Sequence, residues 1–268
     1  MDSGSGAEGA AGVVTPYAAA RSRVALHDWS PELQKAKVYE QILLDIILGQ
    51  LAPGARLDEQ ELVKRYQAGL AGVRDALGRL ALEGLVIRRA RSGTTVSPLD
   101  IIEVRQAFEA CGLIEPHCAA LAAINADDEE VALITRAFDG GEDAVRRRDH
   151  RALVAMDQHF HASVAIASGN TTLARILIPL QHKATRFWAY AMNDDGPEAQ
   201  VAELQRHRAV AARIAKRDAE GAREAMMAAL GISADSVNRV AGNPVVSTTQ
   251  SPPQSAAIWA SRPRARRG

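Results

Sequence analysis

Apolar side chains recur at helical spacing through most of the chain, and the pattern changes character near residue 98. Before that point the helices are short. The first has an apolar stripe that ends at Gly49, made of Val38, Ile42, Leu43, Ile46 and Ile47. A Pro-Gly turn follows, then a short helix over 58–66 capped by Asp58 and a third helix over 70–83 that stops at Gly84. Two strands over 85–89 and 94–96 then predict a β-hairpin.

Every long segment after residue 98 has the periodicity of an α-helix. We expect six helices, at about 99–123, 127–148, 150–168, 171–192, 198–217 and 219–231. Because the breaks between them are short, consecutive helices are expected to run antiparallel and form a bundle. The fold class is therefore mainly α, with a small helix-and-hairpin part followed by an all-helical antiparallel bundle.

Four segments follow from these patterns. Residues 1–30 are rich in Gly, Ala and Ser without sustained periodicity and are expected to form a disordered arm. Residues 31–97 form the first folded domain, and 98–240 form the helical domain. Residues 241–268 are rich in Pro, Ser and Gln, carry arginines without acids, and are expected to be a disordered basic tail.

Composition narrows the class of protein. Aromatic residues make up only 4% of the 268 residues and hydrophobic residues 47%, so Ala, Leu, Ile and Val must fill the core. The formal net charge is zero, so global charge does not indicate a nucleic-acid partner. With neither a secretory signal nor a membrane span expected, we predict a cytoplasmic protein that needs no membrane. Cys111 and Cys118 lie too far apart on one helix for a disulfide and are expected to be buried thiols.

Three short helices and a hairpin outline a winged helix-turn-helix, which places its last helix in the major groove of DNA and its wing beside the backbone. Arg88, Arg89 and Arg91 cluster at the expected wing, where phosphate contacts need cations. The full set of candidate DNA-binding residues is Arg56, Lys64, Arg65, Arg74, Arg79, Arg88, Arg89 and Arg91. The alternative is a solvated charged surface on a small domain.

The run LAPGARLDEQELVKRY, followed by VRDALGRLALEGLVIRRARSGTTV, resembles the DNA-binding domain of the GntR superfamily of bacterial transcriptional regulators. The resemblance covers about 60 residues and implies binding of a double-stranded DNA operator by a homodimer. The chain departs from the family where a Ser-Arg-Thr-Pro-like run enters the recognition helix, because it has Gly69-Leu70-Ala71-Gly72 there. Gly72 in the first turn costs about 1 kcal/mol of helix stability against alanine.

The helical part resembles the FCD ligand-binding domain of the FadR branch, and its six expected helices fit the shorter, VanR-like form. The motifs are EVR with Glu109, DQHFH followed by Gly169-Asn170, HRAV from His207, and DAEGAREAM from Asp218. The resemblance implies a sensor for a small organic or sugar acid. Arg105 and Arg186 are candidates to bind the carboxylate of that effector, although Arg105 could equally pair with Glu109 and Arg186 could be a surface residue.

Asp157 and His161 lie one helical turn apart, so their side chains share a face and can chelate one metal ion. His159 points to the opposite face and is expected to be exposed. The FCD resemblance adds His207 as a third ligand and places Ala229 where such domains carry a fourth histidine. His182 is then a possible fourth ligand. Nitrogen and oxygen ligands suit Zn²⁺ or a similar divalent ion. The alternative is a helix pair with an interior histidine in a site that has lost its metal.

Three functions compete on this evidence. The first, which we favour, is a ligand-responsive DNA-binding transcriptional regulator. The second is a sensor whose DNA-binding head has decayed and which acts through protein contacts. The third is a metal-dependent hydrolase, which we do not favour: the sequence lacks a zinc-protease motif, a nucleophile elbow and a phosphate loop, so we expect no enzyme and assign no catalytic residue.

Overall fold

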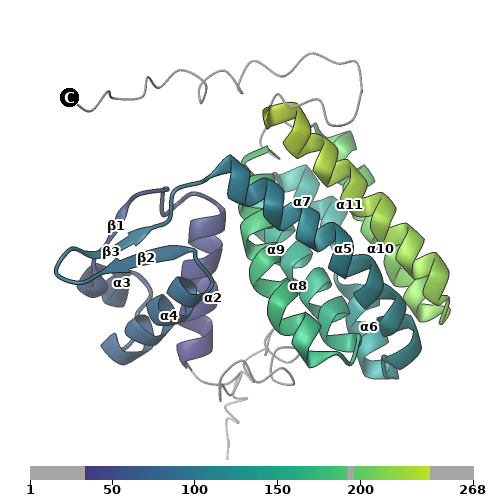
Figure 1. Cartoon of the computed structure of the whole chain (residues 1–268), viewed down its shortest axis with the longest axis horizontal. Helices are drawn as coiled ribbons and strands as arrows, with labels where there is room; N and C mark the ends of the chain where they lie inside the picture. The colour runs from purple at the N-terminus through teal and green to yellow at the C-terminus, as the bar shows by residue number, and fades with distance from the viewer. Residues whose placement is uncertain (1–33, 192–195, 242–268) are drawn as a thin grey trace, which may run out of the picture.

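The computed structural model describes residues 34–191 and 196–241, and within them a small α/β head lies beside a larger helical bundle (Figure 1). The expected arm over 1–30 and most of the expected tail over 241–268 lie outside the described residues. The head contains α2 (Gln34–Ile47), β1 (Arg56–Leu57), α3 (Glu59–Arg65), α4 (Leu70–Leu82), β2 (Val86–Arg89) and β3 (Gly93–Val96).

The wing of the head is a three-stranded antiparallel sheet in the order β1-β3-β2. The expected hairpin is its β2-β3 half, where Arg89 pairs with Gly93 and Val86 with Val96. Both expected strands are confirmed, but a third was missed, because β1 adds Arg56 opposite Thr95 on the other side of β3. A strand of two residues carries no alternation of its own, so only its pairing with β3 reveals it.

The head has an aliphatic core between α2 and α4. Ile42, Ile46, Val73 and Leu77 are each fully buried there. The recognition helix α4 forms despite its weak entry: Gly69 is its N-cap with φ −73° and ψ 149°, and no side chain caps the helix.

The helical part contains α5 (Ile101–Asn125), α6 (Asp128–Arg136), α7 (Gly141–Arg147), α8 (His150–Ala167), α9 (Thr171–Ala191), α10 (Pro197–Ala215) and α11 (Ala219–Ala241). The fold class is therefore confirmed, but the count of six helices is wrong, since the described residues hold seven. The expected helix over 127–148 breaks at Gly140, which has φ +79°. The break brings Gly141 so close to α10 that a Cβ there would lie 2.8 Å from Leu204.

Helix α5 is the central element of the bundle and packs against α8, α9, α10 and α11. By length and composition alone it could cross a membrane, and half of its most apolar window is buried inside the protein. Cys111 and Cys118 on this helix are buried and free, as expected.

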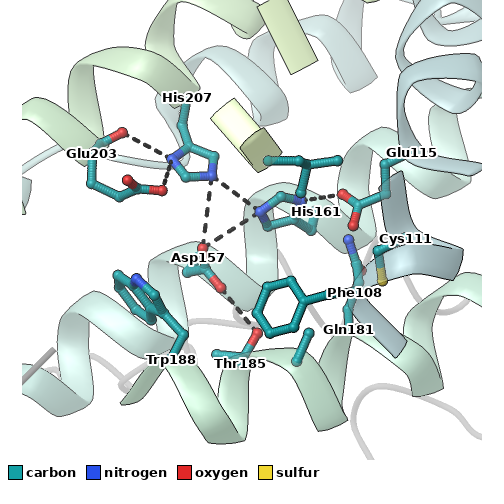
Figure 2. A pocket seen from close by; sticks show the side chains of 12 residues that line it. Phe108, Cys111, Glu115, Asp157, His161, Gln181, Thr185, Trp188, Glu203 and His207 are labelled. Atoms are coloured by element: carbon teal, nitrogen blue, oxygen red, sulfur yellow. Dashed lines mark hydrogen bonds and ion pairs between the residues drawn. The ribbon is translucent and has the colours of Figure 1, made fainter. Parts of the chain in front are cut away.

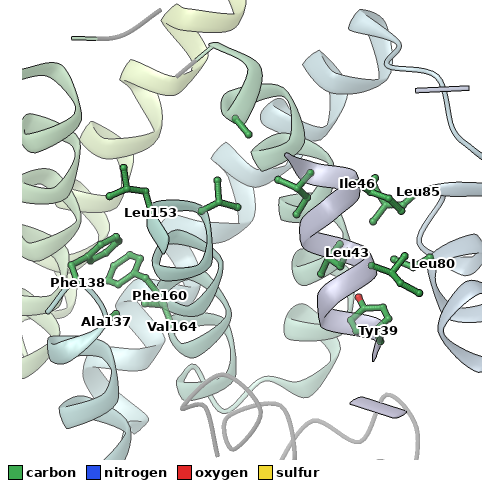
Figure 3. Packing of buried hydrophobic residues seen from close by; sticks show 14 of the residues in the cluster. Tyr39, Leu43, Ile46, Leu80, Leu85, Ala137, Phe138, Leu153, Phe160 and Val164 are labelled. Carbon is green, nitrogen blue, oxygen red and sulfur yellow. The ribbon is translucent and has the colours of Figure 1, made fainter. Parts of the chain in front are cut away.

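Head and bundle share one continuous hydrophobic core. Helix α2 lies between them: Tyr39, Leu43 and Ile46 belong to the same buried cluster as Leu80 of α4 and Phe160 of α8 (Figure 3). The bundle contacts of α2 are with α8 and α9. Helix α8 also carries Asp157 and His161, and α9 carries His182 and Arg186.

Candidate functional site

Three predicted metal ligands meet inside the bundle. Helix α8 presents Asp157 and His161 one turn apart, and α10 presents His207 from across the core (Figure 2). The Nε2 atoms of the two histidines lie 3.1 Å apart. The Oδ1 atom of Asp157 lies 3.5 Å from Nε2 of His161 and 3.8 Å from Nε2 of His207. All three side chains are buried.

These separations fit a divalent metal ion. Zinc bonds of about 2.0–2.1 Å in tetrahedral geometry place neighbouring ligand atoms roughly 3.3 Å apart. The other ring nitrogens are already occupied, since Nδ1 of His161 lies 2.6 Å from the Glu115 carboxylate and Nδ1 of His207 lies 2.9 Å from the carbonyl oxygen of Glu203. With Nδ1 protonated and donating, each Nε2 can direct a lone pair at the same point. The ligand atoms of Asp157, His161 and His207 therefore fit a bound divalent ion such as Zn²⁺.

The charges of the three groups depend on one another. Burial works to raise the pKa of Asp157, but the nearby His161 and His207 outweigh it and hold that pKa below its ordinary value. For His161, burial is outweighed by the carboxylates of Glu115 and Asp157, which raise its pKa well above the usual range. Burial and the charge on His161 lower the pKa of His207. A proton on His161 therefore places a positive charge beside the carboxylates of Glu115 and Asp157 when no metal ion is bound.

The three candidate metal ligands line a cavity of about 30 Å³, enough for an ion and a few ligand atoms. Its wall includes three carboxylates, Glu115, Asp157 and Glu203, but no lysine or arginine among the residues that the structure describes. The remaining lining residues are Phe108, Cys111, His161, Gln181, Ala184, Thr185, Trp188, His207 and Leu230. Thr185 donates to Oδ2 of Asp157 at 3.2 Å and so helps to orient that ligand.

Four sequence-based expectations fail at this site. His182 cannot be the fourth ligand, because it faces the head, where its Nδ1 lies 2.9 Å from Glu83. Arg186 is buried and donates to the carbonyl and hydroxyl oxygens of Ser97, at 2.8 and 3.1 Å, so its guanidinium does not reach the cavity. Arg105 is exposed on α5 and does not line the cavity either. His159 is buried rather than exposed, and burial lowers its pKa to about 4.

Two residues that support the site, Glu115 and Thr185, were not predicted from the sequence. Glu115 had a usable signal, because it is a lone acid between the two buried cysteines in an apolar run. Such an acid needs a partner when it is buried, and His161 is that partner. Thr185 had no such signal, since only the packing of α9 against α8 brings its hydroxyl to Asp157.

The candidate DNA-binding residues separate into two groups. Seven are exposed, namely Arg56, Lys64, Arg65, Arg74, Arg88, Arg89 and Arg91. The wing sheet gathers four of these, because β1 contributes Arg56 beside Gly93, and β2 and its turn contribute the others. Arg65 is about half exposed and forms an ion pair with Asp45 at 2.5 Å.

Arg79 is placed where it cannot reach DNA. Its side chain is 11% exposed, it pairs with Glu83 at 3.0 Å, and its guanidinium lies 3.9 Å from the centre of the Tyr39 ring. This arginine therefore holds α4 against α2. The expectation that Arg79 contacts DNA is therefore wrong, because its side chain is largely buried.

Comparisons with known proteins agree with this architecture. Residues 34–96 match the family described as bacterial regulatory proteins, gntR family, and residues 103–231 match the FCD domain. The chain is 22% identical over 191 residues to an uncharacterized HTH-type transcriptional regulator, YdhC, of Bacillus subtilis, covering 71% of this chain and 84% of that protein. It is 24% identical to the HTH-type transcriptional repressor RspR of Escherichia coli, covering 76% of this chain and 89% of RspR.

Solved structures show the same fold. Escherichia coli McbR/YncC superposes with a TM-score of 0.66 at 18% identity, covering 77% of this chain and 98% of that one. A GntR regulator from Rhodococcus sp. RHA1 superposes with a TM-score of 0.59 at 19% identity, covering 76% and 96%. A winged helix-turn-helix head followed by an FCD bundle is thus supported by sequence and by fold: the chain belongs to the GntR family of bacterial transcriptional regulators and carries an FCD effector-binding domain.

Proposed function

We propose that this protein is a homodimeric, cytoplasmic regulator that binds a DNA operator and responds to a small organic or sugar acid held at a divalent metal ion. The observation that carries the sensing half is the convergence of Asp157, His161 and His207 on one point, with both Nδ1 atoms engaged elsewhere. Zn²⁺ or a similar ion suits these ligands.

The charge of the cavity supports a metal-dependent effector site. Carboxylates and histidines line it, and the arginines expected to bind an acid lie elsewhere. A carboxylate ligand would meet net repulsion from Glu115, Asp157 and Glu203. A bound divalent ion would supply the positive charge that such a ligand needs. A relative from Paenarthrobacter nicotinovorans, 27% identical, is named as a probable D-xylose utilization operon repressor, which agrees with a sugar-derived effector.

The wing and recognition helix support operator binding. Arg88 and Arg89 lie exposed on β2, and the Arg88 guanidinium lies 3.6 Å from where a Cβ of Gly78 would stand, so it spans wing and helix. Arg74 is 58% exposed on α4, and its ion pair with Glu59 is a surface pair that DNA can displace. Helix α4 is intact without a side-chain cap, which favours a working head over a decayed one.

Exposed apolar side chains support a dimer. Leu113, Ile124 and Ile102 on α5 are 76%, 65% and 56% exposed. Apolar side chains gathered on one helix are typical of a surface that a partner covers. A two-fold protein would match a pseudo-palindromic operator.

The test combines metal analysis with DNA binding. Protein purified without a histidine tag is analysed for metal, and its affinity for the DNA upstream of its own gene is measured with and without EDTA. A panel of small organic and sugar acids is then tested with metal present. The proposal predicts bound metal, salt-dependent DNA binding, and acid responses that EDTA abolishes. Substoichiometric metal in both wild type and His161→Ala, with unchanged acid response, would refute the metal-dependent sensing.

A further inference from the structure

Helix α9 faces the cavity on one side and the DNA-binding head on the other. Gln181, Thr185 and Trp188 follow one another at helical spacing and line the cavity (Figure 2). Their neighbours His182 and Arg186 contact the head. One rigid helix therefore touches both sites through adjacent faces.

The head contacts of α9 fall on the two elements that would meet DNA. Glu83, which accepts from His182, is the C-cap of the recognition helix α4. Ser97, which accepts from Arg186, directly follows β3 of the wing. All four side chains are at least nine-tenths buried, so these hydrogen bonds are shielded from water and sensitive to small displacements.

The face of α9 that lines the cavity also carries buried polar side chains. Thr185 donates to Asp157 at 3.2 Å and accepts from Gln158 at 2.6 Å, so α9 is linked to a metal-ligating side chain. Gln181 is 4% exposed, and its Nε2 has no hydrogen-bond partner among the residues that the structure describes. A buried amide donor without a partner is costly unless something in the cavity accepts its hydrogen bond. A carboxylate oxygen of a ligand is a suitable acceptor.

We propose that α9 couples the cavity to the DNA-binding head, with Gln181 as the contact to a ligand oxygen and with His182 and Arg186 as the contacts to α4 and the wing. This inference rests on the proposed function, because it assigns the route by which occupancy of the cavity alters DNA binding. A ligand that displaces Gln181 and Thr185 moves the backbone that also carries His182 and Arg186. The recognition helix and wing then change their placement together.

Hydrogen exchange on the full-length protein tests the coupling without DNA or metal. The change on the cavity side is Thr185→Val, which removes the hydroxyl that Asp157 and Gln158 use. The change on the head side is His182→Leu, which leaves Glu83 with hydrogen bonds from Tyr39 and Arg79. Exchange is followed in peptides covering 79–97, in wild type, in both single variants and in the double variant. Arg175→Ala, on an exposed position of the same helix, is the control.

Coupling predicts that Thr185→Val raises exchange in the head peptides by roughly 2–10-fold, the effect expected when the free energy of about one of the two lost hydrogen bonds reaches the head. The same substitution has less effect in the His182→Leu background, and Arg175→Ala has none. Changes confined to 153–189, with head peptides at wild-type rates, would overturn the inference. If His182→Leu does not fold, Glu83→Gln serves as the head-side change.

A thermal melt of ligand-free Gln181→Leu tests the role of that residue. A ligand contact predicts a melting temperature at or above wild type, because no hydrogen bond to Nε2 is lost. A clear drop would show that Gln181 is structural and would remove it from the proposal. Neither experiment depends on metal or operator. If the protein bound neither, the proposed function would be refuted, but these experiments would still show whether α9 couples the cavity to the head.

Discussion

The carboxylate behind His161 offers a sharp test of the metal centre. Glu115 accepts from Nδ1 of His161 at 2.6 Å, and both side chains are more than nine-tenths buried. Glu115→Gln keeps the size of the side chain but removes the charge that fixes the ring and raises its basicity. Loss of such a partner typically lowers metal affinity about 10–100-fold. At saturating Zn²⁺ this corresponds to roughly 1.4–2.7 kcal/mol less stabilisation by the metal.

Competition with a chromophoric chelator measures the affinity directly, and melting with and without Zn²⁺ measures its consequence. In a protein of this size the metal-induced rise in melting temperature should shrink by roughly 3–10 °C. Glu109→Gln is the matched control, because Glu109 is an exposed glutamate on the same helix and does not line the cavity. A Zn²⁺ affinity of Glu115→Gln within about threefold of wild type would refute a supporting role for this carboxylate.

Four further variants test the head and the core. Arg74→Ala should weaken binding to the operator by about 1–3 kcal/mol in fluorescence anisotropy; an equal loss on unrelated DNA would contradict base reading. Neutralising Arg88 and Arg89 should weaken binding to all sequences and reduce the slope of affinity against salt by roughly two, whereas an unchanged slope would exclude phosphate contacts. Gly69→Ser should raise the free energy of unfolding by a few tenths of a kcal/mol in urea titrations, and any loss would show that Ser cannot cap α4. Phe160→Ala, at a fully buried position, should cost about 3–5 kcal/mol, so a smaller loss in the same titrations would indicate a core that collapses around the cavity.

Local patterns predicted most of the fold. Helices α8 and α10 begin and end within two residues of their expected bounds, because Asp149 and Pro197 are strong start signals. The i,i+4 spacing on α8 correctly placed Asp157 and His161 on one face, since that geometry is intrinsic to a helix. His207 came from the family resemblance, and the packing of α10 brings it to the other two.

The wrong expectations for His182, Arg186 and His159 share one physical cause, which is packing between distant segments. His182 and Arg186 carry chemistry suited to a metal or a carboxylate, but the face of α9 on which they lie is covered by the head. His159 lies opposite the face that carries Asp157 and His161, yet it lines a cleft between α2, α6 and α8 and is buried there. No spacing rule within one helix reveals which neighbour will cover a given face.

The position of Ala229 connects the metal centre to its proposed role. A structural zinc site is closed by four protein ligands, whereas a site that exchanges ligands keeps a position open. Related domains are expected to carry a histidine where this chain has Ala229, and among the described residues three side chains converge as ligands. Glu115 and Glu203 contact the Nδ1 atoms of the two histidines and so are not available as further metal ligands.

An ion bound here would therefore need a ligand from outside the protein. The cavity beside it presents the Gln181 amide as a donor and contains no competing cation in the described part of the chain. An acid that completes the coordination would also contact Gln181 on α9. The absence of a histidine at Ala229 therefore favours a sensor site over a structural metal site.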